Sequence, residues 1–273
     1  MLPTFILIGS MKSGTSTLHW QLTRHPDVFM TMPKEPRFFN EYFERGLPWY
    51  ERLFDSAAGA VARGEASTDY TAFPKYPETP ARIASVVPDV RLIYLVRDPV
   101  ARMRSHYLHR VGIRRESRPV EEALFDYWGY LNQSRYGMQV ERYLQHFPRE
   151  QLMIVRAEEM FAEPEQVLPR VFDFIGVDST WSSPDPGHRE NGAEKKYQVA
   201  HPIRRVSRAM SRTRIYNAIP QQTRKSIARA VSRSNPPPVP QATISPELRA
   251  KVLDELADDL ELFTRLTGDT VPV

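Results

Sequence analysis

Cysteine does not occur among the 273 residues of this chain. Its absence excludes disulfide bonds, thiolate nucleophiles and cysteine-ligated metal centres. Long apolar runs are also missing, since no stretch reaches the roughly eighteen apolar residues that a membrane-spanning helix requires. The apolar residues 5–8 are too few for a secretory signal peptide, and no basic residue precedes them. We therefore expect a cytoplasmic protein.

Positive charge is spread unevenly along the chain. The net charge is +4, but residues 188–234, here called the basic segment, hold twelve Lys and Arg against two acidic residues, which leaves a net −6 for the rest. Such a concentration predicts an anionic partner, which can be a nucleotide phosphate, an acidic acceptor or a membrane surface. Nucleic acid is disfavoured, because Tyr197 and Tyr216 are the segment's only aromatic side chains suited to stacking on bases.

Apolar runs of strand length alternate with stretches of helical periodicity. The predicted strands cover residues 3–9, 90–96 and 151–155. The predicted helices cover residues 16–24, 100–111, 141–146, 164–175 and 245–266. This alternation predicts an α/β fold in which a mostly parallel sheet is flanked by helices on both faces.

The chain is expected to form one domain with three regions. Residues 1–185 would be the α/β core that carries a nucleotide site. Residues 186–240 would be a basic helical lid or arm that ends in a proline-rich connector. Residues 241–273 would contribute a C-terminal helix that packs on the core, introduced by Ser245 as its cap.

A polar, glycine-containing loop, GSMKSGTS at residues 9–16, lies between the first predicted strand and its helix. Backbone N–H groups of such a loop converge on an anion, where the helix dipole is positive. The spacing differs from the Walker A pattern, because Lys12 precedes Gly14 rather than following it. Lys12 can then neutralise the leaving group of a nucleotide donor. A strand–helix turn with a solvated lysine is the alternative.

A second motif follows the strand predicted at residues 90–96. Arg97 ends this strand before Asp98 and Pro99, and Ser105 lies eight residues further on, in the next predicted helix. A rigid arginine fork and a serine hydroxyl suit a second phosphate in the same cleft. Taken alone, an Arg-Asp-Pro sequence at a strand end is also compatible with a capped turn.

Together the two motifs resemble those of the sulfotransferases that use PAPS, a nucleotide with a sulfuryl group on its 5′-phosphate and a separate 3′-phosphate. Residues 34–39, KEPRFF, are similar to the K-E-P-x-F-F segment of the branch that includes the heparan sulfate N- and O-sulfotransferases. The resemblance runs from about residue 5 to 180 and resumes at the helix that ends before Gly268. It implies a P-loop-like fold of three layers.

The resemblance also implies an activity, transfer of the sulfuryl group to a hydroxyl of a sugar, a lipid or a specialised small molecule, with PAP as product and no metal. Glu35 resembles the family's catalytic glutamate and would act as general base, with Lys12 as the other catalytic residue. The 5′-phosphosulfate would be bound by Lys12, Ser13, Gly14, Thr15 and Ser16. The 3′-phosphate would be bound by Arg97 and Ser105.

Further binding residues are predicted outside the two phosphate-binding motifs. Arg189 and Lys195 would substitute for the family's late basic cofactor loop. The acceptor would be bound by Lys34, Arg37, Tyr70 and Tyr136.

One departure from the family pattern concerns charge. The eukaryotic branch of the family usually has a lysine in an E-K-[ST]-P-x-Y segment, whereas this chain has Ala66 there. Two other functions stay open at this point, a P-loop kinase that uses ATP and Mg²⁺, and a non-catalytic protein that binds an anion or a membrane.

Overall fold

The computed structural model describes residues 1–190 and 242–273. At its centre lies a five-stranded sheet in the order β2-β3-β1-β4-β5, and every neighbouring pair is parallel. Its strands are β1 (Phe5–Gly9), β2 (Val28–Met30), β3 (Ala62–Ala66), β4 (Arg91–Val96) and β5 (Leu152–Arg156). The carboxyl ends of parallel strands share one edge of the sheet, so the loops that follow β1, β3 and β4 meet there.

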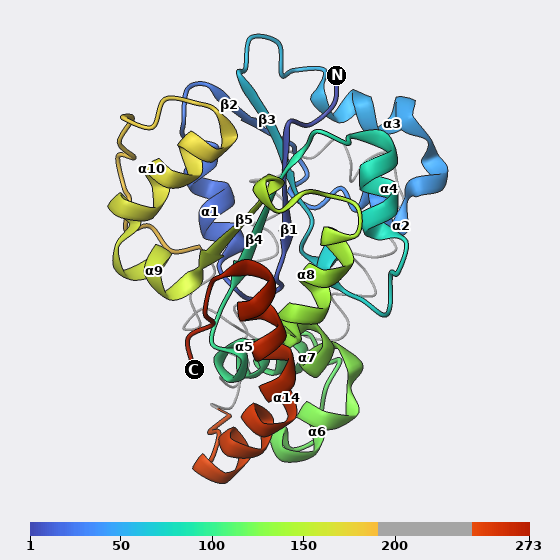
Figure 1. Cartoon of the computed structure of the whole chain (residues 1–273), viewed down its shortest axis with the longest axis vertical. Helices are drawn as coiled ribbons and strands as arrows, with labels where there is room; N and C mark the ends of the chain where they lie inside the picture. The colour runs from blue at the N-terminus through green and yellow to red at the C-terminus, as the bar shows by residue number, and fades with distance from the viewer. Residues whose placement is uncertain (191–241) are drawn as a thin grey trace, which may run out of the picture.

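Helices cover both faces of the sheet (Figure 1), which confirms the predicted three layers. On one side lie α1 (Thr15–Leu22), α9 (Ala157–Ala162) and α10 (Pro164–Ile175). On the other lie α2 (Phe38–Glu41), α3 (Leu47–Glu51), α4 (Thr79–Val86) and α8 (Tyr136–Leu144). The remaining helices are α5 (Pro99–Gly112), α6 (Val120–Asp126), α7 (Trp128–Leu131) and α14 (Pro246–Thr267).

The central strand β1 is buried on both faces. Phe5 and Leu7 pack with Leu18 of α1, whereas Ile6 and Ile8 pack into the aromatic cluster on the opposite side. Burying each such side chain contributes roughly 1.5–3 kcal/mol. Because the helix after β1 and the helix after β3 lie on opposite faces, the edge beyond β1 is the place where an open α/β sheet binds ligands.

The C-terminal helix α14 begins and ends as the sequence predicts. The Ser245 hydroxyl accepts a hydrogen bond from the Leu248 amide (3.1 Å), and Gly268 closes the helix in the left-handed region at φ 74°. One face of α14 lies against α8, at Gly137. A Cβ atom on Gly137 would lie 2.4 Å from the Asp259 carbonyl oxygen, so the close approach of the two helices requires glycine there.

Most of the region predicted as a basic lid, including Lys195 and the proline-rich connector, lies outside the described residues. Within residues 1–190 and 242–273, no helix combines the length and the apolar character needed to cross a membrane.

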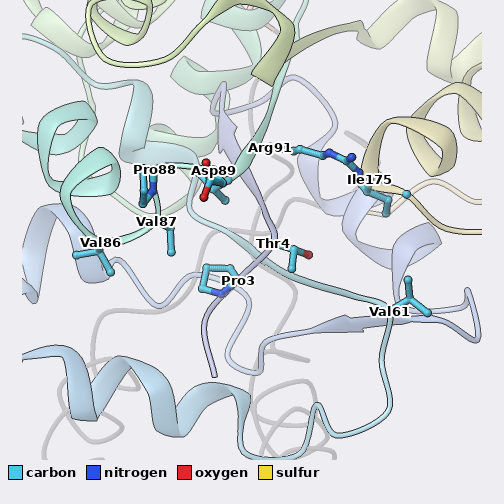
Figure 2. A pocket seen from close by; sticks show the side chains of 11 residues that line it. Pro3, Thr4, Val61, Val86, Val87, Pro88, Asp89, Arg91 and Ile175 are labelled. Carbon is cyan, nitrogen blue, oxygen red and sulfur yellow. The ribbon is translucent and has the colours of Figure 1, made fainter.

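An open groove of about 590 Å³ lies at the amino-terminal ends of the strands (Figure 2). It is bordered by Pro3 and Thr4 before β1, by Val61 before β3, and by Arg91 where β4 begins. These ends form the edge of the sheet opposite the loop that follows β1. The groove is therefore separate from the loop at residues 9–16.

Candidate active site

The loop after β1 has the geometry of an anion-binding turn. Gly14 adopts φ 91°, and a Cβ atom there would lie 2.9 Å from side-chain carbons of Met160 and Phe161. The next two residues, Thr15 and Ser16, open the first turn of α1. Amides in a first helical turn have no partner within the helix, so they can donate to an anion.

Two arginines that follow the neighbouring strand β4 donate hydrogen bonds to the backbone of this loop. Arg97, directly after β4, donates from Nη1 to the Lys12 carbonyl (3.2 Å). Arg102, on α5, donates from Nη1 to the Met11 carbonyl (3.3 Å). The predicted proximity of Arg97 to the loop is therefore found, whereas the sequence analysis did not identify Arg102.

Arg102 is fully buried, which is exceptional for an arginine. Its Nε donates to the Ser134 hydroxyl (2.6 Å), and Nη2 donates to the Gly129 (3.5 Å) and Tyr130 carbonyls. Burial lowers the pKa of its guanidinium from the ordinary value. Carbonyl and hydroxyl oxygens thus replace water around this charge, and they fix the loop to α5 and α7.

The corner that carries the Arg-Asp-Pro motif is held by two further helices. The Tyr136 hydroxyl donates to the Arg97 carbonyl (2.9 Å) and accepts from its amide (3.4 Å). Asp98 caps α5 by accepting from the Ala101 amide (2.6 Å), and it pairs with Arg249 of α14 at 2.7 Å. Ser105, in the same helix α5, is partly exposed two turns beyond this cap.

The segment that contains Glu35 crosses the mouth of the loop. Glu35 accepts hydrogen bonds from the Thr68 hydroxyl and from Arg37 Nη2, each at 3.0 Å. Lys34 donates from Nζ to the hydroxyls of Ser16 (3.1 Å) and Thr15 (3.4 Å). Two motifs that lie about twenty residues apart in the sequence are therefore joined by direct contacts, with Glu35 beside the loop and 28% exposed.

Comparison with known proteins agrees with this geometry. Residues 2–198 match the family model described as a sulfotransferase domain. The chain belongs to this sulfotransferase family. The resemblance stated from the two motifs and the KEPRFF segment is thereby confirmed.

Individual relatives cover different parts of the chain. Human heparan sulfate glucosamine 3-O-sulfotransferase 3B1 is 33% identical over 185 residues, which are 64% of this chain and 46% of that protein. Mouse bifunctional heparan sulfate N-deacetylase/N-sulfotransferase 4 is 27% identical over 202 residues, 64% of this chain and 22% of that protein. This chain thus spans less than half the length of these two relatives.

Solved structures share this fold. A sulfotransferase from Alicyclobacillus acidocaldarius is 25% identical and superimposes with a TM-score of 0.72, covering 99% of this chain and 98% of that one. A sulfotransferase domain from the curacin biosynthetic pathway, at 16% identity and a TM-score of 0.52, shares the fold.

Two residues predicted at the acceptor of this sulfotransferase are placed differently by the structure. Tyr70 and Tyr136 are 2% and 0% exposed, so neither side chain presents a surface to an acceptor. The Tyr70 hydroxyl donates to Glu65 (2.9 Å) and accepts from the Phe39 amide (3.2 Å). Both tyrosines are positioning residues, and the prediction that they bind the acceptor is wrong because their hydroxyls are used inside the protein.

Arg189 lies close to the loop but is engaged with its neighbour. Its guanidinium stands 4.9 Å from the centre of the Phe161 ring and donates to the Phe161 carbonyl (3.1 Å). Phe161 in turn packs against Gly14. The predicted role of Arg189 in binding the nucleotide stays a prediction. Among the residues that the structure describes, no group of three or more His, Asp or Glu side chains is arranged to hold a metal ion.

A buried carboxyl group, that of Glu65, holds neighbouring segments of the site in place. Glu65, in β3, is fully buried and accepts hydrogen bonds from the hydroxyls of Tyr50 (2.7 Å), Tyr70 (2.9 Å) and Ser67 (2.8 Å). Ser67 also accepts from the Arg37 amide (3.1 Å). Glu65 therefore anchors the segment that carries Glu35, although its role was not visible in the sequence because a glutamate within a strand is usually solvated.

Replacing Glu65 with Gln is expected to flatten the pH dependence of stability. Burial raises the pKa of the Glu65 carboxyl from 4.5 to about 7, so the folded protein keeps a proton that the unfolded chain loses. This contribution, up to about 3 kcal/mol, is present in full below about pH 4.5 and is lost as the pH rises through about 7.

The measurement is the melting temperature of both proteins at a series of pH values between about 5 and 8. The wild-type value should fall more steeply with rising pH than that of Glu65→Gln, because the amide does not titrate. Equal slopes in the two proteins would show that Glu65 does not keep its proton.

Proposed function

We propose that this protein transfers a sulfuryl group from PAPS to a hydroxyl group of a sugar or another small acceptor. The observation that carries the proposal is the contact of Lys34 with the hydroxyls that open α1, with Glu35 3.8 Å from the Lys34 ammonium and Arg97 bound to the same loop. The names of the heparan sulfate sulfotransferases among its relatives support a sugar acceptor. The cytoplasmic location expected from the sequence stays a prediction.

The loop residues fit the donor's 5′-phosphosulfate. First-turn amides and the hydroxyls of Thr15 and Ser16 offer donors, and the left-handed Gly14 exposes the backbone to an anion. Lys12 would neutralise the charge that builds on the 5′-phosphate as its bond to sulfur breaks. Arg97 and Ser105 would hold the 3′-phosphate and thereby fix the register of the donor.

Glu35 is suited to act as the base. Its two oxygens accept from Thr68 and Arg37, which fixes the carboxylate in one orientation. The acceptor's oxygen forms the new bond to sulfur, its proton passes to Glu35, and the bond between sulfur and the 5′-phosphate oxygen breaks. Arg37 is shared between Glu35 and Glu41 (3.3 Å), so it also shapes the acceptor side.

A thermal-shift experiment tests the donor site. PAP at about a hundred times its dissociation constant should stabilise the protein by roughly 2.7 kcal/mol, a shift of several degrees. Lys12→Ala should lose most of this shift, because the ammonium that faces the 5′-phosphate is gone. ATP with Mg²⁺ serves as the comparison ligand. A shift with ATP and Mg²⁺ but none with PAP would overturn the proposal in favour of a P-loop kinase.

A further inference from the structure

We propose that Lys34 is a second catalytic cation, which binds the sulfuryl group of the donor while Lys12 serves the 5′-phosphate. The inference rests on the proposed function and adds to it a division of labour between two lysines. It starts from the place of the Lys34 ammonium, which lies on the hydroxyls of Thr15 and Ser16. The segment before Lys34 comes from β2, whereas both hydroxyls belong to α1.

The hydrogen bonds of Lys34 orient its partners toward an anion. A serine or threonine hydroxyl has one proton to donate and two lone pairs to accept with. When Thr15 and Ser16 accept from Lys34, their own protons point away from the ammonium. Lys34 therefore prepares two O–H donors at the mouth of the loop and adds its own charge beside them.

The Lys34 ammonium lies in partly desolvated surroundings, where a charge acts more strongly on a nearby anion than it does in water. Its side chain is 23% exposed, so little water screens it, and burial lowers the pKa of the ammonium. Glu35 Oε1 lies 3.8 Å from Nζ, a distance at which an ion pair contributes little but helps to keep Lys34 charged. A further neighbour, His19, has its pKa lowered to about 4 by burial and by Lys34, so it is neutral and does not compete for an anion.

The end of β3 fixes the place of the segment that carries Lys34. Ala66, the last residue of β3, is fully buried and pairs with Leu7 of β1, so its side chain supplies no cation. The next residue, Ser67, accepts a hydrogen bond from the Arg37 amide at 3.1 Å. The segment 34–37 thus runs across the end of β3, and Lys34 supplies the ammonium on this side of the loop.

The test compares PAPS with PAP, which lacks the sulfuryl group. Dissociation constants of both nucleotides are measured by calorimetry for the wild type and for Lys34→Met. Lys34→Met should weaken PAPS about ten- to a hundredfold more than PAP, because the charge-assisted hydrogen bond to the sulfuryl group is lost only with PAPS. Lys34→Arg keeps the charge and should retain most of the wild-type preference.

Two further variants complete the design. Lys12→Met should weaken both nucleotides, since each has the 5′-phosphate. Lys75→Met is the matched control, because Lys75 is an exposed lysine that stacks on Tyr76 and lies away from the loop, and both affinities should stay at the wild-type level.

Each outcome decides one of the two proposals. If Lys34→Met weakens PAP and PAPS equally, or weakens neither, Lys34 does not bind the sulfuryl group and the inference fails. If the wild type binds neither nucleotide, the proposed function itself fails. The melting temperature of ligand-free Lys34→Met shows whether the variant is folded, and Lys34→Arg gives the same comparison with the charge preserved.

Discussion

Replacing Glu35 with Gln should lower the turnover number about 10²- to 10⁴-fold, the range expected when a general base is removed. The amide has nearly the same shape as the carboxylate and can still accept from the Thr68 hydroxyl, which donates at 3.0 Å in the wild type. It cannot take a proton from the acceptor. Binding of PAP should persist, because the contacts proposed for the nucleotide come from the loop and from Arg97.

Glu41 provides a matched control for this experiment. It pairs with the same Arg37 at 3.3 Å, its side chain is 27% exposed against 28% for Glu35, and it accepts from Tyr76 at 2.8 Å. Glu41→Gln therefore removes the same charge from the same arginine without removing the proposed base. If both variants lose activity equally, Glu35 acts through the electrostatics of Arg37 and is not the base.

Turnover should be followed by the release of PAP, with simple alcohols, phenols and uncharged oligosaccharides offered as acceptors. The turnover of Glu35→Gln is measured at saturating acceptor. Saturation restores activity that was lost through weaker binding of the acceptor, but it does not restore activity that was lost in the chemical step. An unchanged turnover number with a raised Michaelis constant would assign Glu35 to acceptor binding.

Much of the fold could be predicted because its signals are local. The strands β1, β4 and β5 are continuous apolar runs, and α10 and α14 have apolar periodicity between clear start and stop residues. The strands β2 and β3 were missed. β2 has three residues, and β3 reads ARGEA, in which the buried Glu65 is satisfied by hydroxyls distant in the sequence.

The candidate site also contains residues that the sequence indicates and residues that it does not. The loop around Lys12, the Arg97 motif and Glu35 could be proposed from the sequence because each is a short pattern of residue types with a chemical meaning. Arg102 and Glu65 could not, since nothing in one sequence shows that a charged side chain will be buried. Tyr70 was misplaced for the same reason, because an aromatic residue near a motif fits a cleft and a core equally well until its contacts are known.

Replacing the buried Arg102 with Met is expected to destabilise the protein and weaken its binding of PAP together. Methionine fills a similar space but leaves the acceptors of Arg102, among them the Met11 and Tyr130 carbonyls, without their donor. Each unsatisfied buried acceptor costs about 1–3 kcal/mol, although relief from burying a charge offsets part of the sum. We expect a net loss of about 3 kcal/mol, which lowers the melting temperature by roughly 6–12 °C.

A residue that holds the loop should affect both stability and the binding of PAP, whereas an ordinary core residue should affect stability alone. Arg104, on the same helix, donates to the Ala242 carbonyl (2.5 Å) and is partly exposed, so Arg104→Met removes a hydrogen-bonded arginine without freeing the loop. It should cost less than about 1 kcal/mol and leave PAP affinity unchanged. If Arg102→Met lowers the melting temperature but binds PAP as tightly as wild type, the Met11 contact does not shape the nucleotide loop, and Arg97 alone holds it.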